Sequence, residues 1–85
     1  MTFTVVWEET AAGVLAELWM QATDRQAAAD SANRMDRELR NDPHRKGIQH
    51  GPFQAYYDDP LAVLYAVSVD DRMVRVLQVR RIGQG

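Results

Sequence analysis

Apolar residues in the last third of the chain gather in two runs that are separated by a short polar turn. The first run covers residues 60–69 and the second covers residues 73–79, with Asp70, Asp71 and Arg72 between them. Runs rich in valine, leucine and tyrosine on either side of polar turn residues predict a β-hairpin. The first run is apolar on both faces, which is typical of a strand in the middle of a sheet. We therefore expect this hairpin to form the centre of the fold.

The first half of the chain changes from a strand-like to a helical pattern. Residues 2–7 alternate and contain β-branched and aromatic side chains, which predicts a first strand. Thr10 is a plausible N-cap of a first helix, because the apolar residues after it recur on one helical face. These residues are Ala11, Val14, Leu15, Leu18, Trp19 and Ala22. Thr23 and Gln26 match a capping box, so a second helix is predicted almost where the first ends.

The second helix is predicted to have an apolar stripe and a charged face, and to end before Pro43. The apolar stripe consists of Ala28, Ala32, Met35 and Leu39. Charged residues four apart are expected to pair on the exposed face: Asp30 with Arg34, Arg34 with Glu38, and Asp36 with Arg40.

Residues 44–52 contain two glycines and a proline but no acidic residue, which predicts a loop. Residues 53–57 predict a second strand, and the hairpin then supplies the third and fourth. The predicted order is β-α-α-β-β-β. We expect an α+β fold in which a small, mostly antiparallel sheet packs one face against an αα-hairpin. With 85 residues, the chain is expected to form a single domain over residues 1–85.

Composition narrows the functional classes. The chain has no cysteine, which excludes disulfides and thiolate metal sites. It has no apolar stretch near the roughly 20 residues of a membrane span and no signal-peptide pattern, so a cytoplasmic location is expected. Residues 1–43 carry four basic and eight acidic residues, whereas residues 44–85 carry six and four. An anionic partner is therefore expected to meet the C-terminal half.

The candidate chemistry lies in basic and aromatic residues of that half. Common catalytic motifs, a phosphate-binding glycine loop and a metal-ligand cluster are absent from the sequence, so neither a metal nor another cofactor is predicted. Arginines could bind a phosphate and stabilise charge that develops on it during strand cleavage. A histidine near its ordinary pKa could move a proton, with a ribose 2′-OH as the nucleophile.

The predicted catalytic residues are Arg80, Arg81 and His50. The predicted RNA-binding residues are His44, Arg45, Lys46, Arg75 and Tyr57, the last by stacking on bases. His44 is a second candidate for proton transfer. Several of these residues fit plain surface roles equally well, and Tyr65 is expected in the core.

These motifs together resemble the RelE/ParE superfamily of bacterial toxins from type II toxin–antitoxin systems. The resemblance covers nearly the whole chain. It rests on Thr4–Trp7, Leu15–Trp19, Ala27–Leu39 with Asp42 and Pro43, and above all Pro60–Val67 followed by Asp71–Val79. It implies a toxin that is neutralised by a cognate antitoxin. RelE-like members cleave mRNA in the ribosomal A site, whereas ParE-like members inhibit DNA gyrase without nuclease activity.

Carried over residue by residue, the resemblance places Arg81 or its neighbour Arg80 where RelE-like toxins hold a basic residue after the last strand. Arg45 and Lys46 fall in the basic segment before the second strand. Ala62 lies near a position where many members have an arginine, and Gln54 roughly where a basic residue is common.

We therefore expect a ribosome-dependent mRNA endonuclease whose partners are the antitoxin, the ribosome and mRNA. The alternatives are a gyrase inhibitor and a degenerate toxin that only binds its antitoxin. An antitoxin segment, most simply a helix, is expected to cover an apolar groove on the helices or sheet. The free protein is expected to self-associate through that groove.

Overall fold

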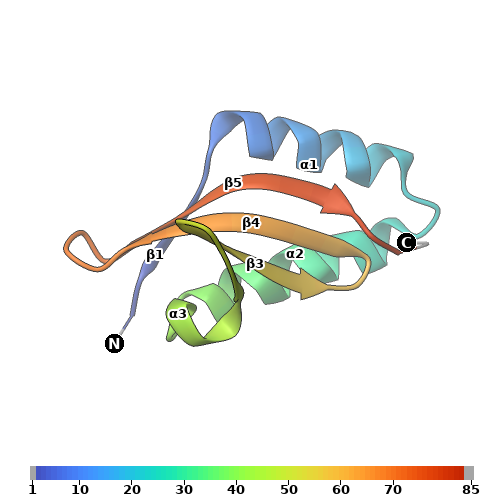
Figure 1. The fold of residues 1–85 in the computed structure, drawn as a ribbon. Coiled ribbons are helices and arrows are strands. Elements are labelled where there is room, and N and C mark those ends of the chain that lie inside the picture. The colour runs from blue at the N-terminus through green and yellow to red at the C-terminus, as the bar shows by residue number, and fades with distance from the viewer. Residues whose placement is uncertain (1, 84–85) are drawn as a thin grey trace.

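The computed structural model describes residues 2–83, which form a five-stranded sheet and three helices (Figure 1). In chain order the elements are β1 (Thr4–Trp7), α1 (Glu9–Gln21), α2 (Arg25–Leu39), α3 (Pro43–Lys46), β2 (Ile48–His50), β3 (Phe53–Asp58), β4 (Leu61–Ser68) and β5 (Met73–Arg81). None of these helices combines the length and the apolar character that a membrane crossing requires.

The strands lie in the order β1-β5-β4-β3-β2, with β1 parallel to β5 and every other pair antiparallel. The predicted α+β fold with a mostly antiparallel sheet is confirmed, as is the central place of the last hairpin. Figure 1 shows α1 running along β5, while α2 packs against β3 and β4. The two long helices therefore cover one face of the sheet.

The prediction of a loop over residues 44–52 is wrong. Pro43 occupies the first turn of the short helix α3, after Asp42 in the left-handed region at φ 48°. Proline suits this position because it has no N–H to leave unsatisfied. Gly51, at φ +59°, then turns the chain so that β2 pairs antiparallel with β3. The predicted order consequently lacked one short helix and one edge strand.

Both predicted helix caps are also wrong by one or two residues. The first helix begins at Glu9, before Thr10, and its N-cap Glu8 makes no capping hydrogen bond through its side chain. The second helix is capped by Asp24, whose carboxylate accepts a hydrogen bond of 3.0 Å from the backbone N–H of Ala27. Asp24 therefore takes the place that the capping-box pattern assigned to Thr23.

The core lies between the helices and the sheet. Its buried members are Phe3, Ala11, Met35, Leu39, Leu61, Val63, Tyr65, Val74, Val76 and Val79. Tyr65 is fully buried, as expected, and its hydroxyl donates a hydrogen bond of 2.7 Å to the carbonyl of Pro43. This bond ties α3 to the middle of the sheet.

Charged residues of α2 link the helix to other elements. Arg34 forms two hydrogen bonds of 2.7 and 2.8 Å with the carboxylate of Asp58 at the end of β3. Glu38 pairs with Lys46 of α3 at 2.8 Å. The predicted pairs of Arg34 with Asp30 and Glu38 are therefore wrong, because Arg34 pairs with Asp58 of β3 and Glu38 pairs with Lys46 of α3. The predicted pair of Asp36 with Arg40 is confirmed at 2.8 Å.

Candidate functional site

The sheet face opposite the helices carries the candidate site, and we call it the open face. Register places Tyr57 of β3, Ala62 of β4 and Arg80 of β5 in one row across three strands. Tyr57 is 44% exposed, whereas Tyr65 on the other face is completely buried. The open face therefore presents side chains to solvent in the middle of the sheet.

A β-bulge decides which of the two C-terminal arginines reaches this face. Leu64 pairs with Gln78 but Tyr65 pairs with Val76, so Leu77 is an extra residue in β5. A bulge shifts the alternation of side chains by one position. As a result Val79 is buried in the core and Arg80 is exposed on the open face. Arg81, the next residue, pairs with the buried Leu61 and points to the opposite side of the strand from Arg80.

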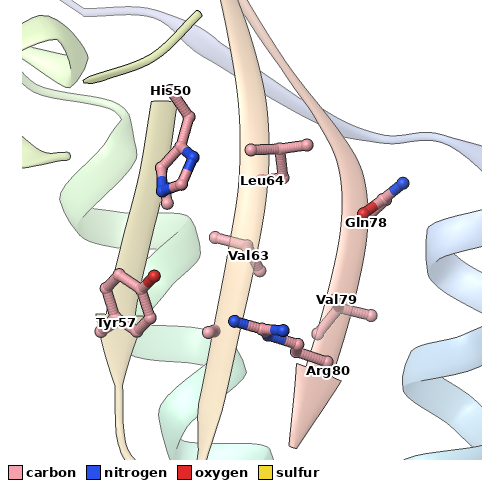
Figure 2. A pocket seen from close by; sticks show the side chains of 9 residues that line it. His50, Tyr57, Val63, Leu64, Gln78, Val79 and Arg80 are labelled. Atoms are coloured by element: carbon pink, nitrogen blue, oxygen red, sulfur yellow. The ribbon is translucent and has the colours of Figure 1, made fainter. Parts of the chain in front are cut away.

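The row of Tyr57, Ala62 and Arg80 borders a hollow of about 220 Å³, which we call the open-face hollow. It is lined by His50, Ala55, Tyr57, Ala62, Val63, Leu64, Gln78, Val79 and Arg80. In Figure 2 the guanidinium of Arg80 extends across β4 toward Tyr57, and the His50 ring reaches toward the same space from the β2 side. Ala62 contributes only a methyl group, which leaves room between the larger side chains.

The structure thus brings together three of the residues predicted from sequence: His50, Tyr57 and Arg80. Within residues 2–83, Arg80 has no carboxylate within ion-pair distance. Its charge is therefore free to meet an anion. An arginine can hold a phosphate in a planar two-point contact, and a tyrosine at the rim can stack on a base.

The basic residues of α3 do not join this hollow. Lys46 donates to Glu38 at 2.8 Å, and this contact raises the pKa of Lys46 and lowers that of Glu38. The His44 ring meets Phe3 edge to face, with 6.5 Å between ring centroids. Arg45 is exposed on the same short helix. Together they form a separate basic end beside α2.

Two further positions singled out in the sequence have different surroundings. Gln54 lies on the helix side of β3, 3.2 Å from the hydroxyl of Tyr65, so a basic residue there would not point into the open-face hollow. Arg75 is on the open face but lines a different hollow, with its guanidinium 3.9 Å from Glu8.

The sequence did not identify Gln78 and Phe53 as residues of the open face. A signal for Gln78 was present, because the spacing of Val74, Val76 and Val79 changes from two to three residues. Such a break in alternation is what a bulge produces. The exposure of Phe53, at 36%, had no comparable signal.

A second candidate surface lies between the long helices. An apolar groove of about 310 Å³ is lined by Ala12, Leu15, Ala16, Trp19, Ala28, Ala29, Ala32 and Asn33, and we call it the helix groove. Trp19, at the end of the groove, is 42% exposed. The guanidinium of Arg25 lies over its ring, at 5.0 Å from the ring centroid. Small residues line the groove on both helices: Ala12 and Ala16 on α1, and Ala28, Ala29 and Ala32 on α2.

Comparison with family models and with curated proteins finds no match for this chain. Solved structures do match. A chain of the RelBE2 toxin–antitoxin complex from Mycobacterium tuberculosis superposes with a TM-score of 0.78 at 19% identity, covering 95% of this chain and 92% of that one. A chain of the archaeal RelE–RelB complex from Pyrococcus horikoshii gives 0.67 at 16% identity, with both chains covered completely.

A chain of the chromosomal ParDE system from P. aeruginosa gives a TM-score of 0.72 at 11% identity, with 96% of this chain and 98% of that one covered. All three structures belong to toxin–antitoxin systems. The resemblance read from the sequence is confirmed at the level of the fold: this chain has the RelE/ParE fold.

Proposed function

We propose that this protein is the toxin of a type II toxin–antitoxin pair and that it cleaves mRNA on the ribosome. The observation that carries the proposal is the open-face hollow, where His50, Tyr57 and Arg80 surround a space beside a small residue. The RelE/ParE fold supports a toxin, and the cation, imidazole and phenol suit RNA. Such a toxin acts in the cytoplasm.

In this mechanism the ribose 2′-OH attacks the adjacent phosphorus, and the bond from phosphorus to the 5′ oxygen breaks. The products are a 2′,3′-cyclic phosphate and a free 5′-OH. The guanidinium of Arg80 binds the phosphate and stabilises the charge that builds up on its oxygens. The 2′-OH gives up a proton and the leaving 5′ oxygen takes one up; His50 carries out one of these two transfers and water the other, while Tyr57 stacks on a neighbouring base.

The other predicted residues act outside the hollow in this proposal. Arg45 and His44, at the basic end beside α2, contact ribosomal RNA, and Lys46 contributes its charge while paired with Glu38. Arg81, the last residue of β5, points to the opposite side of the strand from Arg80 and adds general attraction for phosphates.

Primer extension tests the proposal directly. Purified protein is added to ribosomes that are translating a defined mRNA, and the RNA is mapped for new 5′ ends. We expect cleavage within codons in the A site, and much less with His50→Ala. An intact mRNA at a large excess of protein that still stops growth would rule out this mechanism.

A ParE-like inhibitor of DNA gyrase is the second candidate. Ala62 favours it, because a small residue stands where many RelE-like toxins hold an arginine, which leaves Arg80 as the one arginine among the described residues that line the hollow. The likeness to a chain of a ParDE system is in keeping with it. A DNA supercoiling assay distinguishes the two: inhibition of gyrase together with intact mRNA would establish the second function. A degenerate toxin would leave both assays and growth unaffected.

We further propose that the cognate antitoxin docks in the helix groove. An amphipathic helix could bury its apolar face against the alanines and Leu15, with Trp19 at the end of the groove. The same groove would allow the free protein to self-associate. Copurification with the product of an adjacent small reading frame, tagged on that product alone, provides the test.

A further inference from the structure

The open face carries a second hollow in addition to the one at Arg80. It has a volume of about 290 Å³ and is lined by Ala66, Val67, Ser68, Asp71, Met73 and Arg75. In the sheet register Arg75 stands opposite Ala66, as Arg80 stands opposite Ala62. A pair of alanine on β4 and arginine on β5 therefore occurs twice on this face, and a hollow opens at each pair.

Aromatic side chains on β3 repeat with a matching spacing. Phe53 and Tyr57 are four residues apart and are 36% and 44% exposed. Four residues of strand span roughly 13 Å, and β3 lies about 10 Å from β5 across the small residues of β4. The open face thus has two aromatic rings on β3 and two arginines on β5, with Ala62 and Ala66 of β4 between them and Leu64 separating the two alanines.

Exposed aromatic rings beside arginines are the arrangement that binds single-stranded nucleic acid, with bases on the rings and phosphates on the cations. A spacing of roughly 13 Å along the strand is longer than one nucleotide. A single contact at Arg80 would therefore leave Phe53 and Arg75 free for another part of the same strand.

We propose that the open face binds single-stranded RNA along β4 through two subsites, one at Tyr57 and Arg80 and the other at Phe53 and Arg75. This inference rests on the proposed function, since it extends the same site. The first subsite carries the scissile phosphate. The second subsite takes a base and a phosphate further along the strand and contributes affinity.

Acidic neighbours tune the second subsite. Glu8 lies 3.9 Å from Arg75, and both side chains are about half exposed. Asp71, on the hairpin turn, accepts a hydrogen bond of 3.1 Å from Ser68. The ion pair of Glu8 and Arg75 is long and exposed, and such pairs are weak, so a phosphate can replace Glu8 beside Arg75. Glu8 therefore lowers the affinity of this subsite without closing it.

Fluorescence anisotropy with labelled 2′-O-methyl oligoribonucleotides of two and six nucleotides tests the inference. The 2′-O-methyl groups remove the nucleophile, so binding is measured without cleavage. We expect the hexamer to bind about tenfold more tightly than the dimer. Arg75→Ala and Phe53→Ala should remove this advantage and leave dimer binding unchanged. Arg80→Ala should weaken both. Arg37→Ala, an exposed arginine of α2, is the matched control and should change neither.

Glu8→Gln gives a test of opposite sign. It should tighten hexamer binding by up to about fivefold, the range of an exposed ion pair, without affecting the dimer. Equal affinity for the two lengths, absence of binding by both, or an unchanged advantage in Arg75→Ala would overturn the second subsite. Primer extension separates this outcome from the proposed function. Cleavage without length dependence defeats only the second subsite, whereas length dependence without cleavage defeats only the nuclease.

Discussion

Tyr65 shows how one buried polar group can hold two elements together. Its hydroxyl donates to the Pro43 carbonyl at 2.7 Å while its ring fills the core. Burial, with a smaller contribution from Tyr56, raises its pKa to about 12. The phenol therefore stays protonated in the folded protein at a pH where it ionises in the unfolded chain.

The consequence is a loss of stability at alkaline pH. An unfolded tyrosine titrates near pH 10, so between about pH 10 and 12 the unfolded chain releases a proton that the folded state retains. The contribution of the Tyr65 proton to the free energy of unfolding is complete below pH 10. It is lost as pH rises toward 12, where the loss reaches about 3 kcal/mol. Urea unfolding at pH 7 and pH 10.5 measures its onset.

Tyr65→Phe provides the comparison. It should cost about 1–2 kcal/mol at pH 7, because the buried Pro43 carbonyl loses its donor. Its stability should then fall less between the two pH values than that of the parent protein. The slope that remains includes Tyr56, whose pKa burial also raises. A slope in Tyr65→Phe equal to that of the parent protein would contradict the assignment.

Alanine substitutions at two glycines should change the stability of the fold in opposite directions. A Cβ on Gly47 would lie 2.8 Å from the backbone oxygen of Ala55 and would also strike the Tyr65 hydroxyl, whereas a Cβ on Gly13 meets nothing within 4 Å. Gly47→Ala should therefore destabilise the fold by about 1–3 kcal/mol. Gly13→Ala, inside α1, should stabilise it by about 0.5–1 kcal/mol. Thermal unfolding of both variants is the measurement, and a stable Gly47→Ala protein would refute the close approach.

At the scale of elements, local patterns predicted every element except the short helix α3 and the three-residue strand β2. The β4–β5 hairpin was predictable because its alternation and its turn are adjacent in sequence. The three-residue strand β2 was not, because it exists through its pairing with β3 after the turn at Gly51. Pro43 was interpreted only as a helix stop, although it also starts α3. The partners of Arg34 and Glu38 likewise depend on how β3 and α3 pack against α2.

The same limit applies to the candidate site. The sequence pattern identified both Arg80 and Arg81 as candidates, but it did not indicate which of the two reaches the open face. The choice depends on the bulge at Leu77, which is a property of how β5 pairs with β4. The basic residues 44–46 belong to the same predicted RNA-binding set, yet α3 places His44 beside Phe3 and Lys46 beside Glu38. Only part of the predicted basic set therefore meets in one place.

This choice predicts unequal effects of two neighbouring substitutions. Arg80→Ala should lower the rate of ribosome-dependent mRNA cleavage by about 100-fold or more, because a preorganised group that stabilises developing charge is lost. Arg81→Ala removes the same charge one residue away, on the opposite side of the strand, and should change the rate by less than about threefold. Single-turnover cleavage under saturating toxin measures both. Equal losses would show that net charge, and not the open-face hollow, governs the reaction.

At the scale of the molecule, the two candidate surfaces are built by different elements. The open-face hollow is formed by β2, β3, β4 and β5, whereas the helix groove is formed by α1 and α2. The proposed binding in the groove and the proposed chemistry on the open face should therefore be separable by mutation. The arrangement gives the proposed antitoxin a docking surface that does not use the residues of the proposed active site.

Ala16→Glu tests this separation. Ala16 lines the helix groove and is exposed, so the substitution places a carboxylate in an apolar channel at little cost to the fold. We expect antitoxin binding to weaken by at least about tenfold and self-association of the free protein to decrease. Cleavage of mRNA should stay unchanged. Titration calorimetry, sedimentation velocity and primer extension provide the three measurements.

Gln21→Glu adds the same charge at the exposed end of α1, outside the groove, and is the matched control. It should leave all three measurements at the parent values. If Ala16→Glu binds the antitoxin as tightly as this control does, the antitoxin does not use the groove. If Ala16→Glu binds normally but no longer cleaves mRNA, the groove belongs to the active surface instead. The proposed division holds only when the groove variant loses binding and keeps cleavage.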